Sequence, residues 1–522
     1  MSSNTTFKGN LQQFSQSGWM IVAGLAGFKL LIHLLTATNY GFFMDELYFL
    51  ASGQHLAWGY VDFPPLTAFS AWVVRGIFGD SMFGIHLLPA LAGAGLVILT
   101  GLLVHELGGK VFAQAAACLG VVVTSVYLFM NTYLSMNSIE PLIWMGCIYL
   151  LIRIAKTGET RLWLVFGVLA GIGLLNKHTM LIFGFGATIG VLLTQARIRC
   201  WNRWFFLGGA LAVLIFLPNL IWMIQHNFPH LQQLANIRFA RRNVELDPLG
   251  YLGQQVLYQN PFTLPLWLGG LVYFFIHPTG RGYRFIGWTY LLALSLLLLA
   301  DGRPYYLSPL YPVLLAGGAV WGESVLSGGR GKWLKPGFLS VLGISGLILG
   351  PFSLPILPPE VFIRYAKAVP FIQPRIENVY SGALPQLFAL RFGWSEMVDA
   401  VAKVYHELSP EEQARTQILA GNYGEAGAID LYGPARGLPN AFSGHLTYFY
   451  WGQERTSEVS AGATVIVVGY SVVNMRPYFE KTEIAGYVSH PYAMPYENFP
   501  IYLCRGLKVP LSEVWRYLKN FG

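Results

Sequence analysis

The chain has 522 residues, of which 54% are hydrophobic and 11% are charged, and its mean hydropathy is +0.48. These values exclude a soluble protein and are typical of an integral membrane protein. The formal net charge of +8 does not indicate a nucleic-acid partner, because the basic residues occur singly or in twos and threes between apolar runs, as a positive-inside bias predicts.

A membrane-spanning helix needs about 20 mostly apolar residues. By this measure we expect a polytopic α-helical membrane protein with about eleven spans. The first span is expected to be a retained helix rather than a cleaved signal, because it carries Lys29 and His33 and lacks a clear small-residue cleavage site. The predicted spans lie near residues 18–37, 82–104, 111–130, 139–155, 162–176, 179–194, 204–224, 262–277, 284–300, 305–322 and 337–357.

The distribution of basic residues predicts how the chain is oriented. With a cytoplasmic N-terminus, the inner segments, which include Lys8 and Arg330, contain thirteen Lys and Arg residues, and the short outer loops contain six. This asymmetry follows the positive-inside rule. The loops at 38–81 and 225–261 and the segment after residue 357 would then face outward.

The composition changes after residue 357, where the charged fraction rises and the apolar runs shorten to strand length. Strand patterns alternate with helical patterns, which is typical of an α/β domain. We therefore expect a transmembrane domain at 1–357 and an extracytoplasmic α/β domain at 358–522. The predicted strands are 417–420, 464–470 and 501–505, and the predicted helices lie near 394–408 and 512–520.

Several patterns fail to indicate a cofactor. Cys118, Cys147, Cys200 and Cys504 show no paired spacing, so we expect neither a disulfide framework nor a zinc site. HELGGK at 105–110 lacks the second His of a zinc-protease helix. GNYGEAGAIDLYG, which begins at Gly421, lacks dinucleotide-binding spacing, and no Walker sequence is present.

The loop after the first span, YGFFMDELYFLASGQHLAWGYVDFPPL at 40–66, contains the first candidates for chemistry: Asp45, Glu46, His55 and Asp62. Charges this close to a membrane face carry a large desolvation cost, so they usually bind or react with something. A positioned carboxylate can act as a general base. The structural alternative is a helix N-cap or a solvated pair of loop residues.

A second carboxylate, Glu140, precedes Pro141 at the start of the fourth predicted span, in NTYLSMNSIEPLIW. Proline suits the first turn of a helix, and a carboxylate there interacts favourably with the helix dipole, which is a sufficient structural explanation. The functional interpretation is that Glu140 faces the same outer cavity as Asp45.

Cationic side chains occupy the other outer loops. Lys177 and His178 lie in a hairpin so short that both must reach the outer membrane surface, and Arg238, Arg241 and Arg242 stand on the side that the positive-inside rule disfavours. Lys and Arg are the usual ligands of phosphate, so these residues indicate an anionic partner. The alternative is contact with lipid headgroups.

The segment DGRPYYLSPLYP at 301–312 adds Arg303, Tyr305 and Tyr306 at the mouth of the tenth predicted span. Tyrosines are common in interfacial belts, so Arg303 is the stronger candidate. The combined inventory fits the transfer of a group from a lipid-linked phosphate to an acceptor hydroxyl. A carboxylate would take the proton while cations stabilise the leaving phosphate.

These motifs resemble those of bacterial glycosyltransferase family 39. This family belongs to the GT-C superfamily and is related to the protein O-mannosyltransferases and the lipid A aminoarabinose transferase. The resemblance extends from about residue 15 to 470. It rests on YGFFMDELYF with DFPPL, SMNSIEPLIW, GLLNKHT, LPNLIWMIQHNFPHLQQL, GRPYYLSPLYP and NYGEAGAIDLYG, which are specific in combination.

The resemblance implies an inverting enzyme that uses a polyprenyl-phosphate sugar, with a catalytic acidic residue in the first outer loop. That role falls on Asp45, with Glu46 adjacent. Glu140 would correspond to a second acidic position that relatives often fill with Asp. The donor phosphate site would be lined by Lys177, Arg238 and the cluster Arg303, Tyr305 and Tyr306, with Arg241 or Arg242 as alternatives to Arg238.

We include His55, Asp62 and His178 as further pocket residues. Some relatives bind a divalent cation, which His55 or His226 could hold with a carboxylate here, but the sequence defines no ligand set. The expected partners are a lipid-linked sugar donor, membrane lipids and an envelope acceptor, which could be a lipid, a glycan or a protein. The expected location is the bacterial inner membrane.

Two other functions remain open from the sequence. A secondary transporter or lipid flippase would also be polytopic, but such folds often have paired halves and charges near the membrane midplane. An assembly or scaffold protein would use the C-terminal segment to bind partners. The gathering of charges on one outer face favours the enzyme.

Overall fold

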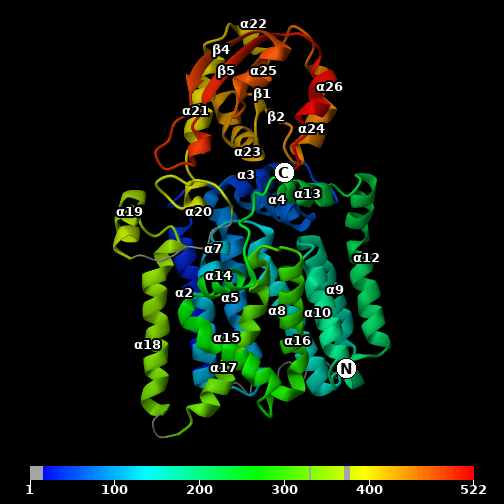
Figure 1. The fold of residues 1–522 in the computed structure, drawn as a ribbon, viewed down its shortest axis with the longest axis vertical. Helices are drawn as coiled ribbons and strands as arrows, with labels where there is room; N and C mark the ends of the chain where they lie inside the picture. The colour runs from blue at the N-terminus through cyan, green and yellow to red at the C-terminus, as the bar shows by residue number, and fades with distance from the viewer. Residues whose placement is uncertain (1–15, 329–330, 370–376) are drawn as a thin grey trace.

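The computed structural model describes residues 16–328, 331–369 and 377–522, so Lys8 and Arg330 of the orientation argument lie outside the described residues. The chain forms two parts along its long axis (Figure 1). A bundle of long helices makes up the lower part of this view, and a β-sheet with its helices makes up the upper part. Between them lie the short helices α3 (Met44–Gln54), α4 (Leu66–Phe78) and α13 (Pro229–Phe239).

Each predicted span coincides with a helix of the bundle. Six helices in the described ranges are long and apolar enough to cross a membrane, and several shorter apolar helices accompany them. The polytopic membrane fold is therefore confirmed, although helix length alone does not fix the number of spans. The bundle helices are α2 (Gln16–Thr36), α5 (Met82–Glu106), α6 (Val111–Val123), α8 (Met136–Thr157), α9 (Leu162–Asn176), α10 (Met180–Leu192), α12 (Arg203–Gln225), α15 (Leu264–Phe275), α16 (Arg284–Leu299), α17 (Tyr311–Val325) and α18 (Gly331–Leu349).

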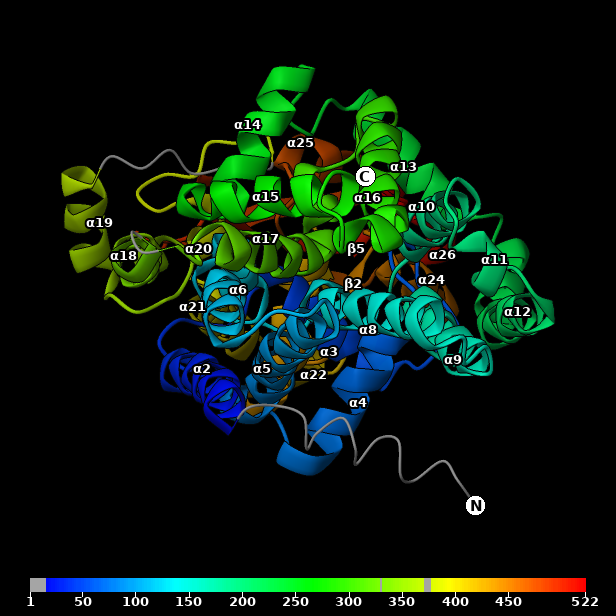
Figure 2. The same cartoon turned by 90° about the horizontal axis from the view of Figure 1, so that it is seen from below.

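The bundle has a central group of helices and a periphery. Seen from below, α5, α6, α8 and α17 lie near the centre, whereas α12 and α18 lie at opposite edges (Figure 2). Glycines allow neighbouring helices to approach closely: a Cβ atom on Gly167 of α9 would lie 2.2 Å from the carbonyl oxygen of Gly208 in α12. Close backbone packing of this kind stabilises helix pairs where lipid offers no hydrophobic contrast.

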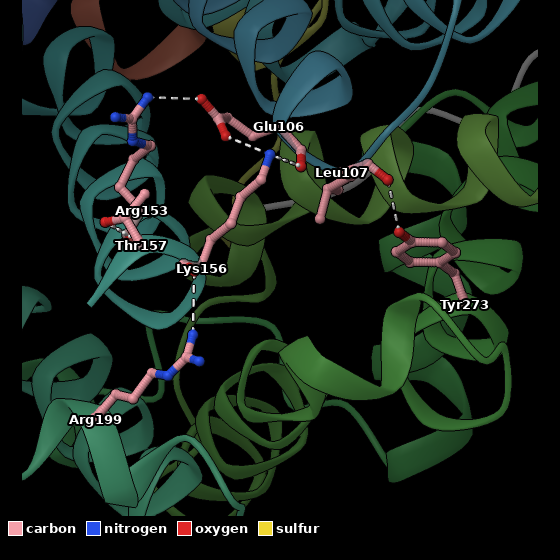
Figure 3. Close-up of polar contacts among 7 residues, drawn as sticks. All are labelled: Glu106, Leu107, Arg153, Lys156, Thr157, Arg199 and Tyr273. Carbon is pink, nitrogen blue, oxygen red and sulfur yellow. Dashed lines mark hydrogen bonds and ion pairs between the residues drawn. The ribbon is translucent and has the colours of Figure 1, made fainter. Parts of the chain in front are cut away.

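The HELGGK segment ends α5 at the end of the bundle away from α3 and α4. The Glu106 carboxylate lies 3.0 Å from both the Arg153 guanidinium and the Lys156 ammonium of α8 (Figure 3). Arg199 donates to the main-chain carbonyl of Lys156, and Tyr273 donates to that of Leu107. This network joins α5 to its neighbours and accounts for Glu106 by structure rather than by catalysis.

The segment at 38–81, expected as a loop between two spans, contains the short helices α3 and α4. Helix α3 has 11 residues and carries Asp45 and Glu46, so it does not read as a span, yet it is buried on nearly every side. Its residues Leu47, Tyr48 and Phe49 belong to the same core as the β-sheet. The segment at 225–261 likewise forms α13 and α14 (Pro248–Tyr258).

The upper part contains a five-stranded sheet in the order β2-β1-β3-β5-β4. Strands β1, β2 and β3 are parallel, and β5 and β4 continue the sheet antiparallel. The sequence predicted β1, β3 and β5 but missed β2, which is very short, and β4, which carries charged side chains. The strands are β1 (Thr416–Ala420), β2 (Ala441–Ser443), β3 (Thr464–Val468), β4 (Phe479–Tyr487) and β5 (Pro500–Leu507).

Helix α23 (Tyr423–Tyr432) follows β1 and lies directly above α3 (Figure 1). The predicted helices appear as α21 (Trp394–His406), and as α26 (Leu511–Val514) followed by a 3-10 turn at Trp515–Leu518. Because α23 begins where β1 ends, the carboxyl edge of the parallel strands faces the upper end of the bundle. Ligands of open α/β sheets commonly bind at this edge.

Candidate active site

Asp45 lies in the first turn of α3, where the helix dipole favours a negative charge. The start of α3 is fixed by a hydrogen bond from the Met44 amide to the carbonyl of Leu390, 3.0 Å away. The hydroxyl of Tyr423 donates to Oδ1 of Asp45 over 2.6 Å. Burial raises the pKa of Asp45, and the Tyr423 hydrogen bond opposes part of that rise.

Two arginines and a carboxylate act electrostatically on Asp45. Oε1 of Glu377 is 3.1 Å from the Arg303 guanidinium and 3.3 Å from that of Arg242. Arg303 also donates to the side chain of Asn243 over 3.1 Å. The charges of Arg303 and Arg242 lower the pKa of Asp45, and that of Glu377 raises it, after the larger effect of burial. These residues therefore share one electrostatic environment.

Lys177 and Glu140 form a second group of the site. The Lys177 ammonium is 3.0 Å from Oε2 of Glu140 and 2.8 Å from Oδ1 of Asn137. It also lies over the ring of Tyr306, 4.3 Å from the centroid, and 5.4 Å from that of Tyr305. The Lys177 ammonium is thus held between a carboxylate and two aromatic faces.

Glu140 does not lie at the start of its helix, as the sequence had suggested. Helix α8 begins at Met136, so Glu140 and Pro141 lie beyond the first turn. The Glu140 carboxylate instead accepts hydrogen bonds from Lys177 and from the Thr179 hydroxyl. The helix-dipole explanation for Glu140 therefore does not apply.

Tyr133 and Arg303 connect the two groups. Tyr133 interacts electrostatically with Asp45 and also with Asn137, the partner of Lys177. Arg303 acts on Asp45, and it also interacts with the hydroxyl of Tyr305, which flanks Lys177. Asp45, Glu140, Lys177 and Arg303, which come from four separate segments, are thus linked by interactions that run through Tyr133 and Tyr305.

Asp62 lies close to this site. The Tyr48 hydroxyl is 2.9 Å from Oδ1 of Asp62, and it also contacts Thr447 in the upper part of the molecule. Burial raises the pKa of Asp62 to about 7, and the negative charge of Asp45 adds to the rise. Asp62 is therefore within electrostatic reach of Asp45.

Glu46 points away from Asp45. It is completely buried, accepts a hydrogen bond from the Leu134 amide over 2.7 Å, and lies 3.0 Å from Nε2 of His86. Adjacent residues of a helix face different directions, which separates the two carboxylates. The assignment of Glu46 beside Asp45 as a catalytic residue is thus not supported by its position, which ties α3 to the bundle.

Arg238 and Arg241 do not reach the site either. Arg238 is paired with Asp301 over 2.9 Å, and Arg241 lies 3.9 Å from Glu245, all on exposed side chains. Arg242, the alternative that the sequence left open, is the arginine of this segment that does reach it. Tyr423 and Glu377 were missed, because the sequence gives no signal that these distant residues approach Asp45.

The candidate histidines have partners other than the site carboxylates. His55 stacks on Trp451 with a centroid distance of 4.6 Å, and His226 stacks on Trp222 at 4.0 Å. His178 lies 3.1 Å from the side-chain oxygen of Asn219. Within the described residues, no group of three or more His, Cys, Asp or Glu side chains is placed to hold a metal ion.

Part of the chain is similar in sequence to known proteins. Residues 62–222 match the family described as dolichyl-phosphate-mannose-protein mannosyltransferase. The chain is 27% identical over 234 residues to lipid A galacturonosyltransferase RgtD of Rhizobium johnstonii, a match that covers 42% of this chain and 47% of that protein. The chain thus matches about half the length of this curated relative.

Comparison of structures extends the likeness to nearly the whole chain. ArnT from Cupriavidus metallidurans bound to undecaprenyl phosphate has a TM-score of 0.57 at 12% identity, covering 94% of this chain and 98% of that chain. The oligosaccharyltransferase of Archaeoglobus fulgidus has a TM-score of 0.52 at 11% identity, covering 81% and 64%. At these identities the likeness concerns the fold, and it agrees with the architecture predicted from the motifs.

Proposed function

We propose that this chain, which belongs with the GT-C glycosyltransferases by its fold and its sequence matches, transfers a sugar from polyprenyl phosphate to a hydroxyl group of an envelope acceptor. The observation that carries the proposal is the gathering of one base and several cations in a single site. The charge of Arg303 acts on Asp45, and Lys177 lies against the same tyrosine pair with which Arg303 interacts.

The reaction follows from these groups. The acceptor oxygen attacks the anomeric carbon of the sugar while its proton passes to the Asp45 carboxylate. The bond between the anomeric carbon and the phosphate oxygen breaks, and its electron pair leaves with the polyprenyl phosphate. A single displacement inverts the anomeric centre. A positioned base contributes about 10² to 10⁴ in rate, and cations stabilise the charge that develops on the leaving phosphate.

The donor phosphate would bind Lys177 and Arg303, with Arg242 nearby. Lysine supplies a point charge and arginine a planar fork that matches two phosphate oxygens. In the structure, the three cations face two carboxylates, since Glu140 pairs with Lys177 and Glu377 pairs with both arginines. A phosphate would therefore bind by replacing or joining Glu377 at the guanidinium groups.

The topology that this function requires places the site on the outer face of the bacterial inner membrane. The proposed transmembrane domain is 1–357, and the proposed extracytoplasmic domain is 358–522. The cluster of Glu106, Arg153, Lys156 and Arg199 supports this orientation, because its net positive charge lies at the other end of the bundle.

The relatives narrow the candidates for the sugar and for the acceptor. ArnT has been crystallised with undecaprenyl phosphate, and RgtD is a lipid A galacturonosyltransferase. We therefore infer that undecaprenyl-phosphate-linked galacturonic acid and lipid A are the donor and acceptor to test first. Other envelope lipids, glycans and proteins follow as acceptors.

The test is transfer by the full-length protein in proteoliposomes. Wild-type protein is expected to form a covalent product, and Asp45→Asn is expected to lose activity by about 10² to 10⁴ while keeping its yield and thermal stability. Glu46→Gln would not serve as a control, because Glu46 supports the fold. Full turnover by Asp45→Asn would remove Asp45 from the mechanism, and solute counterflow without a product would instead indicate a transporter.

A further inference from the structure

Tyr423 brings the β-sheet part of the molecule into contact with the proposed catalytic carboxylate. Its hydroxyl donates to Oδ1 of Asp45 over 2.6 Å, although 378 positions separate the two residues in sequence. Tyr423 is the first residue of α23, and Asp45 lies in the first turn of α3. Two helix N-termini therefore meet at this hydrogen bond.

The contact between α23 and α3 depends on two glycines. A Cβ atom added to Gly427 would lie 2.8 Å from the main-chain carbon of Leu47, and one added to Gly424 would lie 2.5 Å from the Met44 side chain. Real Cβ atoms do not approach backbone so closely, so a larger residue at Gly427 would push the two helices apart. The glycines thus allow α23 to pack directly against α3.

The first turn of α23 is held rigidly. Asn422 caps the helix, since its side-chain oxygen accepts hydrogen bonds from the amides of Gly424 and Glu425. The Glu425 carboxylate accepts in return from the amides of Gly421 and Asn422, over 2.7 and 3.3 Å. This reciprocal capping box satisfies amides that a helix start leaves unpaired, and it fixes the position of Tyr423.

The ring of Tyr423 is also clamped. It packs against Tyr48 of α3 with a centroid distance of 5.1 Å and against His445 at 5.0 Å. Burial raises the pKa of Tyr423 well above its usual value, so the hydroxyl stays protonated and acts as a donor. A fixed donor aimed at one carboxylate oxygen holds that carboxylate in one orientation.

Taking the proposed function as its basis, we propose that Tyr423 is the positioning residue of the base Asp45, and that the β-sheet part of the chain thereby completes the catalytic site. Among the described residues, Tyr423 supplies the hydrogen bond to Oδ1, which leaves Oδ2 to take the proton of the acceptor hydroxyl. The bond also favours the ionised carboxylate, opposing burial and the nearby negative charge of Glu377.

The experiment measures the protonation of Asp45 directly. A hydrophobic carbodiimide reacts with protonated carboxyl groups. The extent of labelling of the peptide that contains Asp45 is measured by mass spectrometry at a series of pH values. This reports the titration of Asp45, and no sugar donor is needed. In full-length Tyr423→Phe, which keeps the ring, the pH of half-maximal labelling is expected to rise by about one unit, since a hydrogen bond to a charged group is lost.

Tyr448→Phe is the matched control. Tyr448 also packs on Tyr48, at 6.2 Å, but its hydroxyl donates to Asp430 over 2.7 Å rather than to Asp45. In Tyr448→Phe, the pH profile of Asp45 labelling should match that of the wild type. In transfer assays, the acid limb of the rate profile of Tyr423→Phe should move upward with the labelling, while the KM for the donor stays within about twofold.

The outcomes separate the two proposals. An unchanged Asp45 labelling profile in Tyr423→Phe overturns the inference, even if Asp45→Asn is inactive. A profile that shifts equally in Tyr448→Phe also overturns it, because the effect would then be structural. A shifted profile together with an active Asp45→Asn enzyme overturns the proposed function, and Tyr423 then has no base to position. As a second variant, Gly427→Ala should shift the profile in the same direction by moving α23.

Discussion

The ammonium group of Lys177 lies 3.0 Å from the carboxylate of Glu140, and both side chains are largely buried. Glu140 lies in α8 and Lys177 follows the end of α9, and each satisfies the charge of the other. Lys177 is thereby held on the ring of Tyr306, next to Tyr305 and Arg303. Glu140 thus serves the site by holding the cation, and its effect on transfer should depend on Lys177.

Glu140→Gln is expected to destabilise the protein by about 3 to 5 kcal/mol, because it leaves a buried ammonium without its carboxylate. The double variant Lys177→Met with Glu140→Gln should recover most of this loss, since no unpaired charge remains, but its transfer activity should stay low. Thermal unfolding in detergent and the transfer assay check the two effects. Wild-type transfer by the double variant would exclude Lys177 as a phosphate ligand.

Glu377→Gln is expected to tighten the binding of undecaprenyl phosphate about tenfold, equivalent to about 1.4 kcal/mol. The physical reason is that Glu377 now occupies the guanidinium groups of Arg242 and Arg303 that the phosphate would use. Titration of the purified protein with undecaprenyl phosphate measures the change in affinity. Asp301→Asn, which removes the exposed partner of Arg238, is the control and should leave the affinity unchanged.

Arg242→Ala is expected to weaken the binding of undecaprenyl phosphate about tenfold or more, because it removes a cation next to Asp45 and Arg303. Arg241→Ala and Arg238→Ala remove the same charge from exposed positions nearby, so both should stay within about twofold of the wild type. The same binding assay compares the three variants. Equal losses in all three would indicate general attraction to the anionic lipid rather than a defined site.

The stability of the β-sheet part is expected to fall as pH rises. Glu425 and Glu497 are buried together near Asn422, and burial raises the pKa of Glu425 to about 7 and that of Glu497 well above its usual range. The folded protein therefore binds more protons than the unfolded chain above pH 4.5, so this contribution is complete below that pH and declines as pH rises through 7.

Thermal unfolding between pH 5 and 8 measures this dependence. Glu497→Gln should flatten it, because a neutral amide then occupies the place of one carboxyl and Glu425 can ionise without a facing charge. A stability that increases with pH over this range in the wild type would contradict the raised pKa values of Glu425 and Glu497.

Local composition explains which features could be predicted. The spans, and strands β1 and β3, are contiguous apolar runs, and hydrophobicity alone marks them for burial in lipid or in a core. Strand β4 was missed because charged side chains interrupt it, so it contains no such apolar run. Helix α3 was taken for a loop because its burial comes from α23 and the bundle, which no local pattern reveals.

The site shows the same division. Lys177, Glu140 and Arg303 stood out because a charge at a membrane face is costly, and the structure brings them together. The sequence could not distinguish Arg242 from Arg238 and Arg241, because the three differ in direction along one short segment rather than in chemistry. It also grouped Glu46 with Asp45, although neighbouring helical residues diverge.

By itself, the sequence determined that this protein is a polytopic membrane protein with a β-sheet part after its helices, and it predicted which charged residues form a site, because burial and charge cost are properties of each segment. Only the tertiary structure decided that Tyr423 and Glu377 face the residues they control. Hydrogen bonds and ion pairs act over about 3 Å, and packing alone determines which distant residues come that close.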